Sequence, residues 1–420
     1  MAQAPVYSQA ELMRHIRMLS VTIGPRRSAS PAEGQAAEYV AAELRQWADT
    51  VAIQPFASAP TYGWSMLFTV VMAIAGGLLA QWFPWPGFIL ATAGAGAYLF
   101  YQMGAMEWLN RVCPFQPSRN VVAVIRPSGA ARRRAVLAAH MDTARSAPMY
   151  NPTQIKGMKA SVLLSAGLGV LLAVLTLLAA LLPGVTAIRW AALLPAAGML
   201  YAAYMMLHRE LFCQVVPGAN DNASGVAALI ELGRRFSAHR LAETELWLVA
   251  TGSEEVIASI GMGHFVRRYG AELRGAAVIA LDNFGAGDLR YLKSEGLLCQ
   301  AHSSPELLDL AAQVASRHPD WQVKPSRCTL GYTDAIRALG GGLKAMAIWA
   351  ERPNGDAPEG IGSCGLPHYH WPSDTIEHIE PETVARACAF TGEMLEAIDA
   401  GALEAWALTH RRHAAGPGGC

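Results

Sequence analysis

The pattern of hydrophobic and polar positions contains two stretches that are apolar for longer than a soluble helix requires. No charged residue occurs between Asp49 and Glu107, and this gap holds apolar runs at 64–80 and 88–103. Runs of about 17–23 apolar residues are as long as a bilayer requires of a helix. A Pro- and Gly-containing turn separates the two runs, so the pattern predicts a transmembrane hairpin over residues 64–104.

A second pair of apolar runs lies at 160–182 and 187–207, separated by Pro183 and Gly184. We expect a second transmembrane hairpin over 160–207, and therefore four membrane-spanning helices in all. The alternative is a very apolar hairpin buried in a globular core. It is less favoured because few soluble folds bury four such helices in pairs.

Each hairpin returns the chain to the side it left, so all polar segments share one side of the membrane. Positive charges flank the spans on that side at Arg111, Lys156, Lys159 and Arg209, whereas the short turns carry only Arg189. By the positive-inside rule we expect a multi-pass protein of the cell membrane with its polar part in the cytoplasm. Tryptophans near the span ends would form interfacial belts: Trp64, Trp82, Trp85, Trp108 and Trp190.

Outside the hairpins, short apolar strands alternate with amphipathic helices. Strands are expected at 51–56, 120–125, 135–139, 245–250, 276–281 and 344–349, and helices at 10–19, 36–48, 226–236 and 381–400. This order predicts an α/β fold with a mixed, mostly parallel β-sheet sandwiched by helices. One domain would be assembled from segments 1–63, 105–159 and 208–410, followed by a flexible tail over 411–420.

Composition agrees with a partly membrane-embedded chain. Of the 420 residues, 52% are hydrophobic and only 16% are charged, against about a quarter charged in soluble domains. The formal net charge of +0 argues against a nucleic-acid partner. The seven cysteines are scattered without a CxxC pair, which fits reduced thiols better than a disulfide framework.

Histidine and acidic residues cluster where predicted strands end. His140 follows the strand 135–139, the Glu254-Glu255 pair follows 245–250, and Asp282 follows 276–281. Ligands of parallel sheets bind at the carboxyl ends of strands. Taken singly, these side chains are more often loop histidines, solvated acids or turn caps, so the prediction of a shared site rests on the set.

Asp221 and His370 complete a set that suits two zinc ions. Zinc takes histidine nitrogen and carboxylate oxygen, and two zinc ions about 3.5–4 Å apart need a bridging carboxylate. Asp221 lies between two asparagines in a glycine-flanked turn at a helix start, where it would otherwise be a simple cap. We assign it as the bridge, with His140 and Asp282 on one metal and Glu255 and His370 on the other.

Three further residues are candidates for the chemistry. Glu254 cannot chelate beside its neighbour Glu255 in an extended segment, so it is placed to take a proton from a metal-bound water. Asp142 follows His140 by two residues and would steer its ring. Tyr332 is a candidate donor to the oxyanion.

These segments resemble the M28 family of zinc aminopeptidases. The matching segments are 136–143, 217–225, 251–255, 280–282, 331–334 and 369–375. The resemblance implies His140, Asp221, Glu255, Asp282 and His370 as zinc ligands, Glu254 as general base and Asp142 as the orienting residue. It also implies a mixed sheet sandwiched by helices and a cis peptide between Asp221 and Asn222. This chain departs from the family at Thr333-Asp334-Ala335 and in the long insertion between His140 and Asp221.

The leading hypothesis is a membrane-embedded co-catalytic dizinc amidohydrolase, most simply an aminopeptidase that removes N-terminal amino acids. A second hypothesis is a dizinc amidase for an aminoacylated or N-acyl lipid presented by the bilayer. A glutaminyl-cyclase-like enzyme with one zinc and an inactive membrane scaffold with a peptidase fold are the remaining alternatives. The expected partners are the lipid bilayer and a peptide or amide substrate; association into a homo-oligomer stays open.

Overall fold

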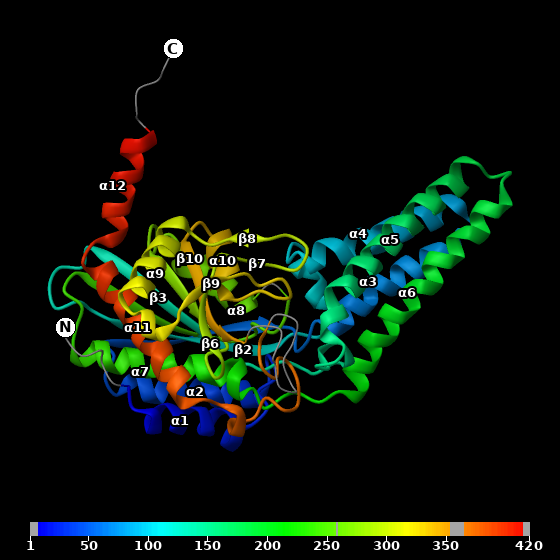
Figure 1. Cartoon of the computed structure of the whole chain (residues 1–420). Helices are drawn as coiled ribbons and strands as arrows, with labels where there is room; N and C mark the ends of the chain where they lie inside the picture. The colour runs from blue at the N-terminus through cyan, green and yellow to red at the C-terminus, as the bar shows by residue number, and fades with distance from the viewer. Residues whose placement is uncertain (1–6, 258, 353–364, 415–420) are drawn as a thin grey trace, which may run out of the picture.

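The computed structural model describes residues 7–257, 259–352 and 365–414. Its centre is an eight-stranded sheet in the order β1-β2-β4-β3-β5-β10-β6-β9 (Figure 1). The strands of this sheet are β1 (Thr50–Ser58), β2 (Gln116–Ile125), β3 (Arg133–His140), β4 (Thr244–Thr251), β5 (Ala277–Leu281), β6 (Asp288–Leu292), β9 (Lys324–Ser326) and β10 (Lys344–Glu351). A separate short pair consists of β7 (Ser294–Glu295) and β8 (Ala301–His302).

The middle of the sheet is parallel. β3 runs parallel to both β4 and β5, and β5 runs parallel to β10. β1, β2 and β6 add antiparallel pairings toward the edges. The predicted mixed sheet is confirmed, and its parallel centre brings the carboxyl ends of β3, β4 and β5 to one edge.

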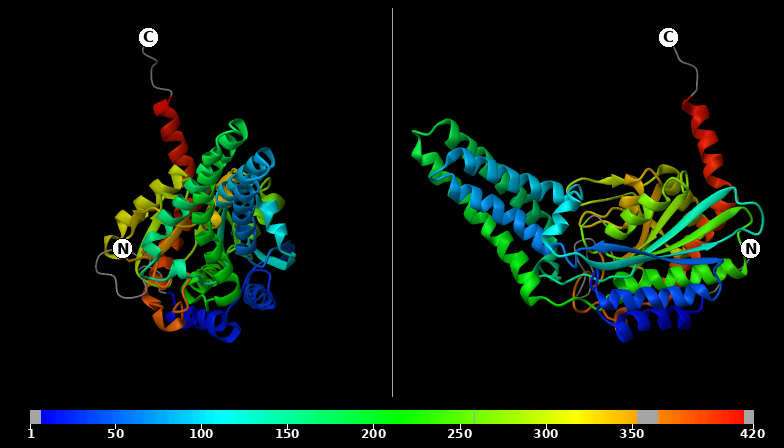
Figure 2. Two further views of the ribbon diagram at one scale, coloured as in Figure 1. Left: turned by 90° about the vertical axis from the view of Figure 1, so that its right-hand side faces the viewer. Right: turned by 180° about the vertical axis from the view of Figure 1, so that it is seen from behind.

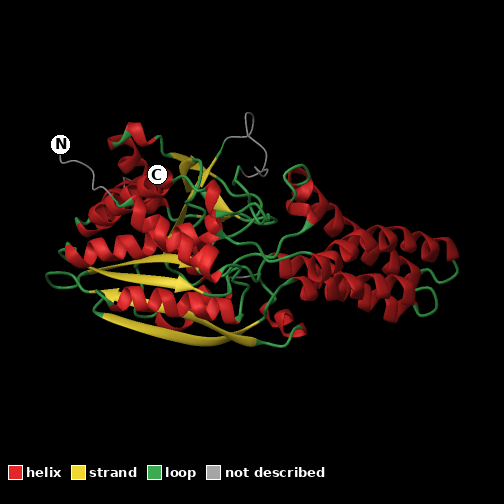
Figure 3. Ribbon diagram, turned by 90° about the horizontal axis from the view of Figure 1, so that it is seen from below, coloured by secondary structure: helices red, strands yellow, loops and turns green. Residues whose placement is uncertain are grey.

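Helices cover both faces of the sheet. On one face lie α1 (Gln9–Arg17), α2 (Pro31–Arg45), α7 (Gly225–Ala238), α9 (Pro305–Arg317) and α11 (Pro381–Asp399), and on the other α8 (Ile260–Tyr269) and α10 (Asp334–Gly340) (Figures 1 and 3). Strand β3 contributes side chains to the core on both faces of the sheet. Leu137 packs with the first group of helices and Val136 with the second. This alternation is what a strand buried on both faces requires.

Four long helices form an arm that projects from the α/β domain (Figures 1 and 2). They are α3 (Gly63–Leu79), α4 (Pro84–Gln102), α5 (Met158–Leu181) and α6 (Thr186–Phe212). Glycines let α3 and α4 pack closely, since a Cβ on Gly94 would lie 2.3 Å from the Ala73 nitrogen and one on Gly76 would lie 2.2 Å from the Ala91 nitrogen. Close approach through small residues is typical of helices that pack in membranes.

Two of the four arm helices are long and apolar enough to cross a membrane. They are α6 and the segment Ile155–Leu181, which contains α5; α3 is apolar but shorter, with 17 residues. Helix α4 does not qualify because Pro, Trp, Tyr and Gly residues lower its mean hydropathy. The prediction of four spanning helices is therefore supported for two, while the two helical hairpins are both present.

The last described helix, α12 (Ala402–Ala414), leads away from the domain (Figure 1). Its final residues, 411–414, belong to the segment for which a flexible tail was expected, and they are helical. Residues 415–420 lie outside the described part of the chain.

Candidate metal centre

The sheet brings four of the predicted site residues to one edge. His140 is the last residue of β3 and pairs in register with Thr251, the last residue of β4. Glu254 and Glu255 follow β4 directly, and Asp282 follows β5. Because these strands are parallel neighbours, their carboxyl ends meet, as the sequence predicted.

Asp221 lies between two histidines. One of its carboxylate oxygens, Oδ1, is 3.1 Å from His140 Nε2, and the other, Oδ2, is 3.2 Å from His370 Nε2. Asp221 is 2% exposed, so this contact is shielded from water. A carboxylate with one oxygen directed at each of two imidazoles has the geometry that a bridge between two cations requires.

Each histidine also faces a second carboxylate. Asp282 Oδ1 is 3.6 Å from His140 Nε2, and Glu255 Oε2 is 3.3 Å from His370 Nε2. The structure thus groups the five residues into two sets that share Asp221. Ligand atoms of His140, Asp221 and Glu255 all lie within 4.8 Å of one another.

The protonation of His140 follows from its other nitrogen. Its Nδ1 lies 3.0 Å from the carbonyl oxygen of Asp142, which can only accept a hydrogen bond. Nδ1 therefore carries the proton when the ring is neutral, and the lone pair on Nε2 points at Asp221 and Asp282. A backbone carbonyl that fixes the tautomer in this way is the usual partner of a metal-binding histidine.

The donor set fits zinc. Two histidine nitrogens and three carboxylates are ligands that zinc prefers. In addition, Glu255 Oε1 is buried without a hydrogen-bond partner, a costly arrangement unless a cation compensates it. These five side chains would hold the metal.

Electrostatics at the site are those of acids crowded together away from water. Burial raises the pKa of Glu254 well above its ordinary value and also raises the pKa values of Glu255 and Asp282. Burial by itself lowers the pKa of His370, but the nearby Glu255 and Asp221 charges raise it to about 10. Four carboxylates beside two imidazoles leave excess negative charge, which bound cations would neutralise.

Comparison with known proteins shows which family shares this arrangement. Residues 207–394 match the model of peptidase family M28. This region of the chain is similar to peptidase family M28. It contains Asp221, Glu254, Glu255, Asp282 and His370, and it begins after His140. A comparison with curated proteins found no match.

Solved structures share the fold of this chain over nearly its whole length. A zinc aminopeptidase from Bacillus subtilis is 16% identical, with a TM-score of 0.55, and the match covers 94% of this chain and 95% of that one. A leucine aminopeptidase precursor from Bacteroides thetaiotaomicron is 15% identical, with a TM-score of 0.57 and coverages of 94% and 99%. A glutaminyl cyclase from an Acidobacteriales bacterium is 17% identical, with a TM-score of 0.57 and coverages of 95% and 98%. Family match and fold together support a zinc-dependent metallopeptidase.

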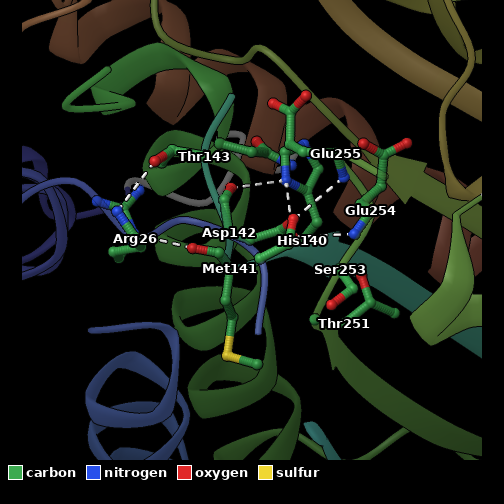
Figure 4. A network of polar contacts seen from close by, with 12 residues as sticks. Arg26, His140, Met141, Asp142, Thr143, Thr251, Ser253, Glu254 and Glu255 are labelled. Atoms are coloured by element: carbon green, nitrogen blue, oxygen red, sulfur yellow. Dashed lines mark hydrogen bonds and ion pairs between the residues drawn. The ribbon is translucent and has the colours of Figure 1, made fainter. Parts of the chain in front are cut away.

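Within the site, the Asp142 side chain holds the backbone of both glutamates. Its carboxylate accepts hydrogen bonds from the backbone nitrogens of Glu254 at 3.0 Å and Glu255 at 3.1 Å, and from the Ser28 hydroxyl at 2.5 Å (Figure 4). The same carboxylate is 3.8 Å from His140 Nδ1, farther than the Asp142 carbonyl oxygen. Asp142 therefore contacts the ring mainly through its backbone and positions the glutamates through its side chain.

Arg26 is a positioning residue that sequence reasoning missed. Its buried guanidinium donates to the carbonyl oxygens of Met141, Pro217 and Gly218 at 2.8–2.9 Å, and the Met141 contact is visible in Figure 4. It thereby joins the segment after His140 to the turn before Asp221. Burial lowers its pKa to about 10, so the group stays charged at neutral pH. Only the folded chain reveals this role, because these carbonyls lie more than a hundred residues away from Arg26 in sequence.

Tyr332 and Tyr150 both line the cavity beside the metal ligands. The hydroxyl of Tyr332 donates to the carbonyl oxygen of Gln102 in α4 at 2.6 Å, so the Tyr332 proton is used in a hydrogen bond to the arm. Tyr150 packs edge-on against the His370 ring, with centroids 4.6 Å apart, and its hydroxyl lies 3.0 Å from that of Tyr62. Tyr150 was not among the sequence-predicted residues, since nothing in its local pattern separates it from a core tyrosine.

Proposed function

We propose that this protein is a co-catalytic dizinc aminopeptidase that removes N-terminal amino acids from peptides or related amides. The observation that carries the proposal is the position of Asp221, whose two oxygens each face a different histidine that also meets a second carboxylate. When bound, the zinc pair acidifies water and polarises the substrate carbonyl.

Glu254 is the residue assigned to proton transfer. It lines the cavity beside the ligands, and Asp142 accepts a hydrogen bond from its backbone nitrogen, so the residue is anchored next to the proposed metal site. Figure 4 shows the Glu254 and Glu255 carboxylates as separate groups on the far side of the backbone from Asp142. In the reaction, Glu254 accepts a proton from water and delivers it to the leaving nitrogen.

Metal content and activity of matched variants test the proposal. We expect the purified protein to hold two zinc ions per chain and to hydrolyse aminoacyl amides. Glu254→Gln is expected to keep both metals and lose at least a hundredfold in kcat, whereas Asp221→Ala is expected to lose metal as well. Full turnover by Glu254→Gln would overturn the assignment of the base.

Cyclisation of N-terminal glutamine is the alternative reaction, and it is considered because glutaminyl cyclases are among the similar structures. Incubation with glutaminyl and leucyl peptides separates the two. A single zinc ion per chain with release of pyroglutamyl product would favour the cyclase.

We further propose that the arm anchors the enzyme in a membrane, with the catalytic domain in the cytoplasm. The support is that α5 and α6 are only 28% and 33% buried over their most apolar windows, so they are not core helices. Among the residues that the structure describes, most of the exposed large hydrophobic side chains also lie on the arm. The test is labelling of single cysteines in intact cells. Cys299, on the catalytic domain, is expected to be protected from an impermeant reagent until the membrane is opened.

A further inference from the structure

We propose that the base of the arm is a binding site for an unbranched hydrocarbon chain attached to the scissile amide. The inference rests on the amide-hydrolase function proposed above and names the class of substrate: an amide of a long-chain lipid acid or amine. Hydrolysis adds one water across the amide, so the C–N bond breaks, a C–O bond forms, and the products are a carboxylic acid and an amine. Glu254 carries the transferred proton.

A single cavity connects the metal ligands to the interior of the arm. Its volume is about 510 Å³, and its wall includes His140, Asp221 and His370 at one end. At the other end the wall is made by all four arm helices: Met66 and Val70 on α3, Tyr98 on α4, Val162 and Ser165 on α5, and Ala202, Met205 and Met206 on α6. A molecule bound at the metal ligands can therefore extend into the space between the arm helices.

The arm end of the cavity is neutral and mostly apolar. Among the described residues that line it there, none is Asp, Glu, Lys or Arg, and the polar members are Tyr62, Tyr98, Gln102, Ser161, Ser165 and Tyr201. Methionines from three helices contribute, and their flexible thioether chains adapt to long, featureless ligands. An ionised group in the buried end would lack a charged partner, which excludes a charged chain end.

The dimensions set a limit on length. The lining extends from Tyr62, the residue before α3, to Val70, and on α5 from Met158 to Ser165, which at 1.5 Å per residue is about 10–12 Å along the arm. One turn farther, Gly169 of α5 closes against Ala95 and Met199, because a Cβ on it would meet them at 3.2 and 3.8 Å. The cavity consequently ends blind inside the arm.

A hydrocarbon chain suits this end better than a peptide. A peptide extended over 10–12 Å would bring about three residues, each with an N–H and a C=O that need partners. Backbone groups of the arm helices are already paired within the helices, and the few side-chain polar groups do not provide a strand-like row of partners. An alkyl chain makes no such demand and gains from burial.

Chain-length dependence of hydrolysis tests the proposal. The full-length zinc-loaded protein, held in amphipol, is given N-acylglycines and leucine n-alkylamides whose chains grow from two to ten carbons. We expect kcat/KM to rise about fourfold per methylene in one series, until the cavity is filled. The series in which kcat/KM rises shows whether the enzyme accepts the hydrocarbon chain on the acyl side or on the amine side of the amide.

Filling the blind end provides a matched pair of variants. Val70→Phe places a ring inside the cavity, whereas the neighbouring Val71 is 48% exposed, so Val71→Phe adds the same ring outside. We expect Val70→Phe to lower kcat/KM at least tenfold for the ten-carbon chain and less than twofold for the two-carbon chain, with Val71→Phe unchanged for both. If Val70→Phe does not fold, Ala202→Leu fills the same end from α6.

A second readout needs no turnover. The zinc-free protein is irradiated with an N-acylglycine that carries a diazirine near the end of its chain, and labels on Met66, Met205 or Met206 are expected. Rates independent of chain length, or labels only outside the arm, would overturn this inference while leaving the aminopeptidase proposal intact. Failure of the zinc-loaded protein to hydrolyse any amide, short or long, would instead overturn the proposed function.

Discussion

Asp221 is held by its sequence neighbours as well as by the histidines it faces. The Asn222 side chain donates to the carbonyl oxygen of Leu281 at 2.8 Å, and Asn220 accepts from the Gly285 nitrogen at 2.6 Å. Both contacts tie the turn to the segment that carries Asp282. Asp374 accepts from the backbone nitrogens of Asn220 at 2.7 Å and Asp221 at 3.1 Å. The side chains of Asn220 and Asn222, which flank Asp221 in sequence, therefore hold its turn against the segment that carries Asp282.

Several residues at the site adopt a left-handed backbone that is unusual without glycine. Ser253 has φ of 53°, Asn283 has φ of 50° and His370 has φ of 51°. Each lies at or beside a proposed ligand or the proposed base, and such conformations cost of order 1–3 kcal/mol. Because three of them lie at this site, we infer that some fold stability is lost there in order to orient the side chains.

Loss of the Arg26 guanidinium is expected to loosen both strand-end segments. Arg26→Met keeps much of the chain length but leaves several buried carbonyl oxygens without donors, at about 1–3 kcal/mol for each unsatisfied group. We expect a clear fall in the unfolding temperature and in bound zinc, measured by scanning fluorimetry and metal analysis. Arg27→Met, at the half-buried neighbouring position, is the control. Equal behaviour of the two variants would contradict the positioning role.

A pH-dependent contribution is expected from the Arg14–Glu43 pair between α1 and α2. The hydrogen-bonded Arg14 guanidinium, 3.0 Å away, lowers the pKa of Glu43. A lowered acid pKa stabilises the fold above the unfolded value near 4.3, and this stabilisation is lost as the pH falls through the lower folded value.

Because Arg14 is 45% exposed, the pair is worth about 0.5–1 kcal/mol. Glu43→Gln should therefore be less stable than the parent at pH 7, and the gap in unfolding free energy should close toward pH 3. Denaturant titrations at both pH values measure it. In an Arg14→Gln background the Glu43 substitution should have little effect, and a full effect there would argue against the pair.

At the scale of secondary structure, the parallel triplet β4-β3-β5 determines where chemistry can occur. Its strands pair in register from Ala135 onward, so their ends align and present His140, the glutamate pair and Asp282 along one edge. The arm helices lie next to this edge, since one cavity is lined both by these residues and by α3 and α6. Two hairpins inserted at separate points of the sequence thus form a single body beside the site.

Packing of the arm should depend on specific glycines of α4. A Cβ on Gly94 would lie 2.3 Å from the Ala73 backbone, whereas one on Gly96 would meet nothing within 4 Å. Gly94→Ala is expected to push α3 and α4 apart at a cost of about 1–3 kcal/mol. Gly96→Ala should be neutral or stabilising by up to about 1 kcal/mol, because alanine favours helix. Thermal unfolding of the solubilised protein distinguishes them, and similar losses in both would refute this account.

At the scale of the whole molecule, we expect the crowded acids of the site to make stability depend on bound cations. Asp221, Glu254, Glu255 and Asp282 line one cavity, and cations that bind only the folded chain stabilise it by mass action. We expect a chelator to lower the unfolding temperature by several degrees, and added zinc to restore it.

The stabilisation is about 4 kcal/mol when free zinc exceeds its dissociation constant a thousandfold. Scanning fluorimetry with and without chelator measures the shift, and His370→Ala should reduce it. An unfolding temperature that chelator leaves unchanged would argue against resident metal.

The order of the chain also shapes the whole molecule. The second hairpin lies between His140 and Asp221, which would bind the same metal, so the chain leaves the site, builds half of the arm and returns. The arm base consequently lies next to the ligands. In our proposal, the same arm therefore serves both membrane anchoring and substrate access.

Much of this protein could be predicted from its sequence, because the signals involved are local. Apolar runs longer than a soluble helix needs predicted both hairpins, and short apolar strands predicted most of the sheet. Strand ends followed by His140, Glu255 and Asp282 placed ligand-type residues at one edge. The strands β6 and β9 and the helices α8, α9 and α10 were missed. Two of the five residues of β6 are charged, and β9 is only three residues long.

What only the tertiary structure decided depends on contacts between distant segments. No pattern in sequence shows that Arg26 bonds carbonyls near residues 141 and 217, or that Tyr150 packs on His370. Nor does any pattern show that the four arm helices enclose a blind cavity open to the metal ligands. Side-chain chemistry and the hydrophobic periodicity of a segment depend only on the local sequence. The shape of a cavity and the partners of a buried group exist only once the chain has closed its long loops and packed.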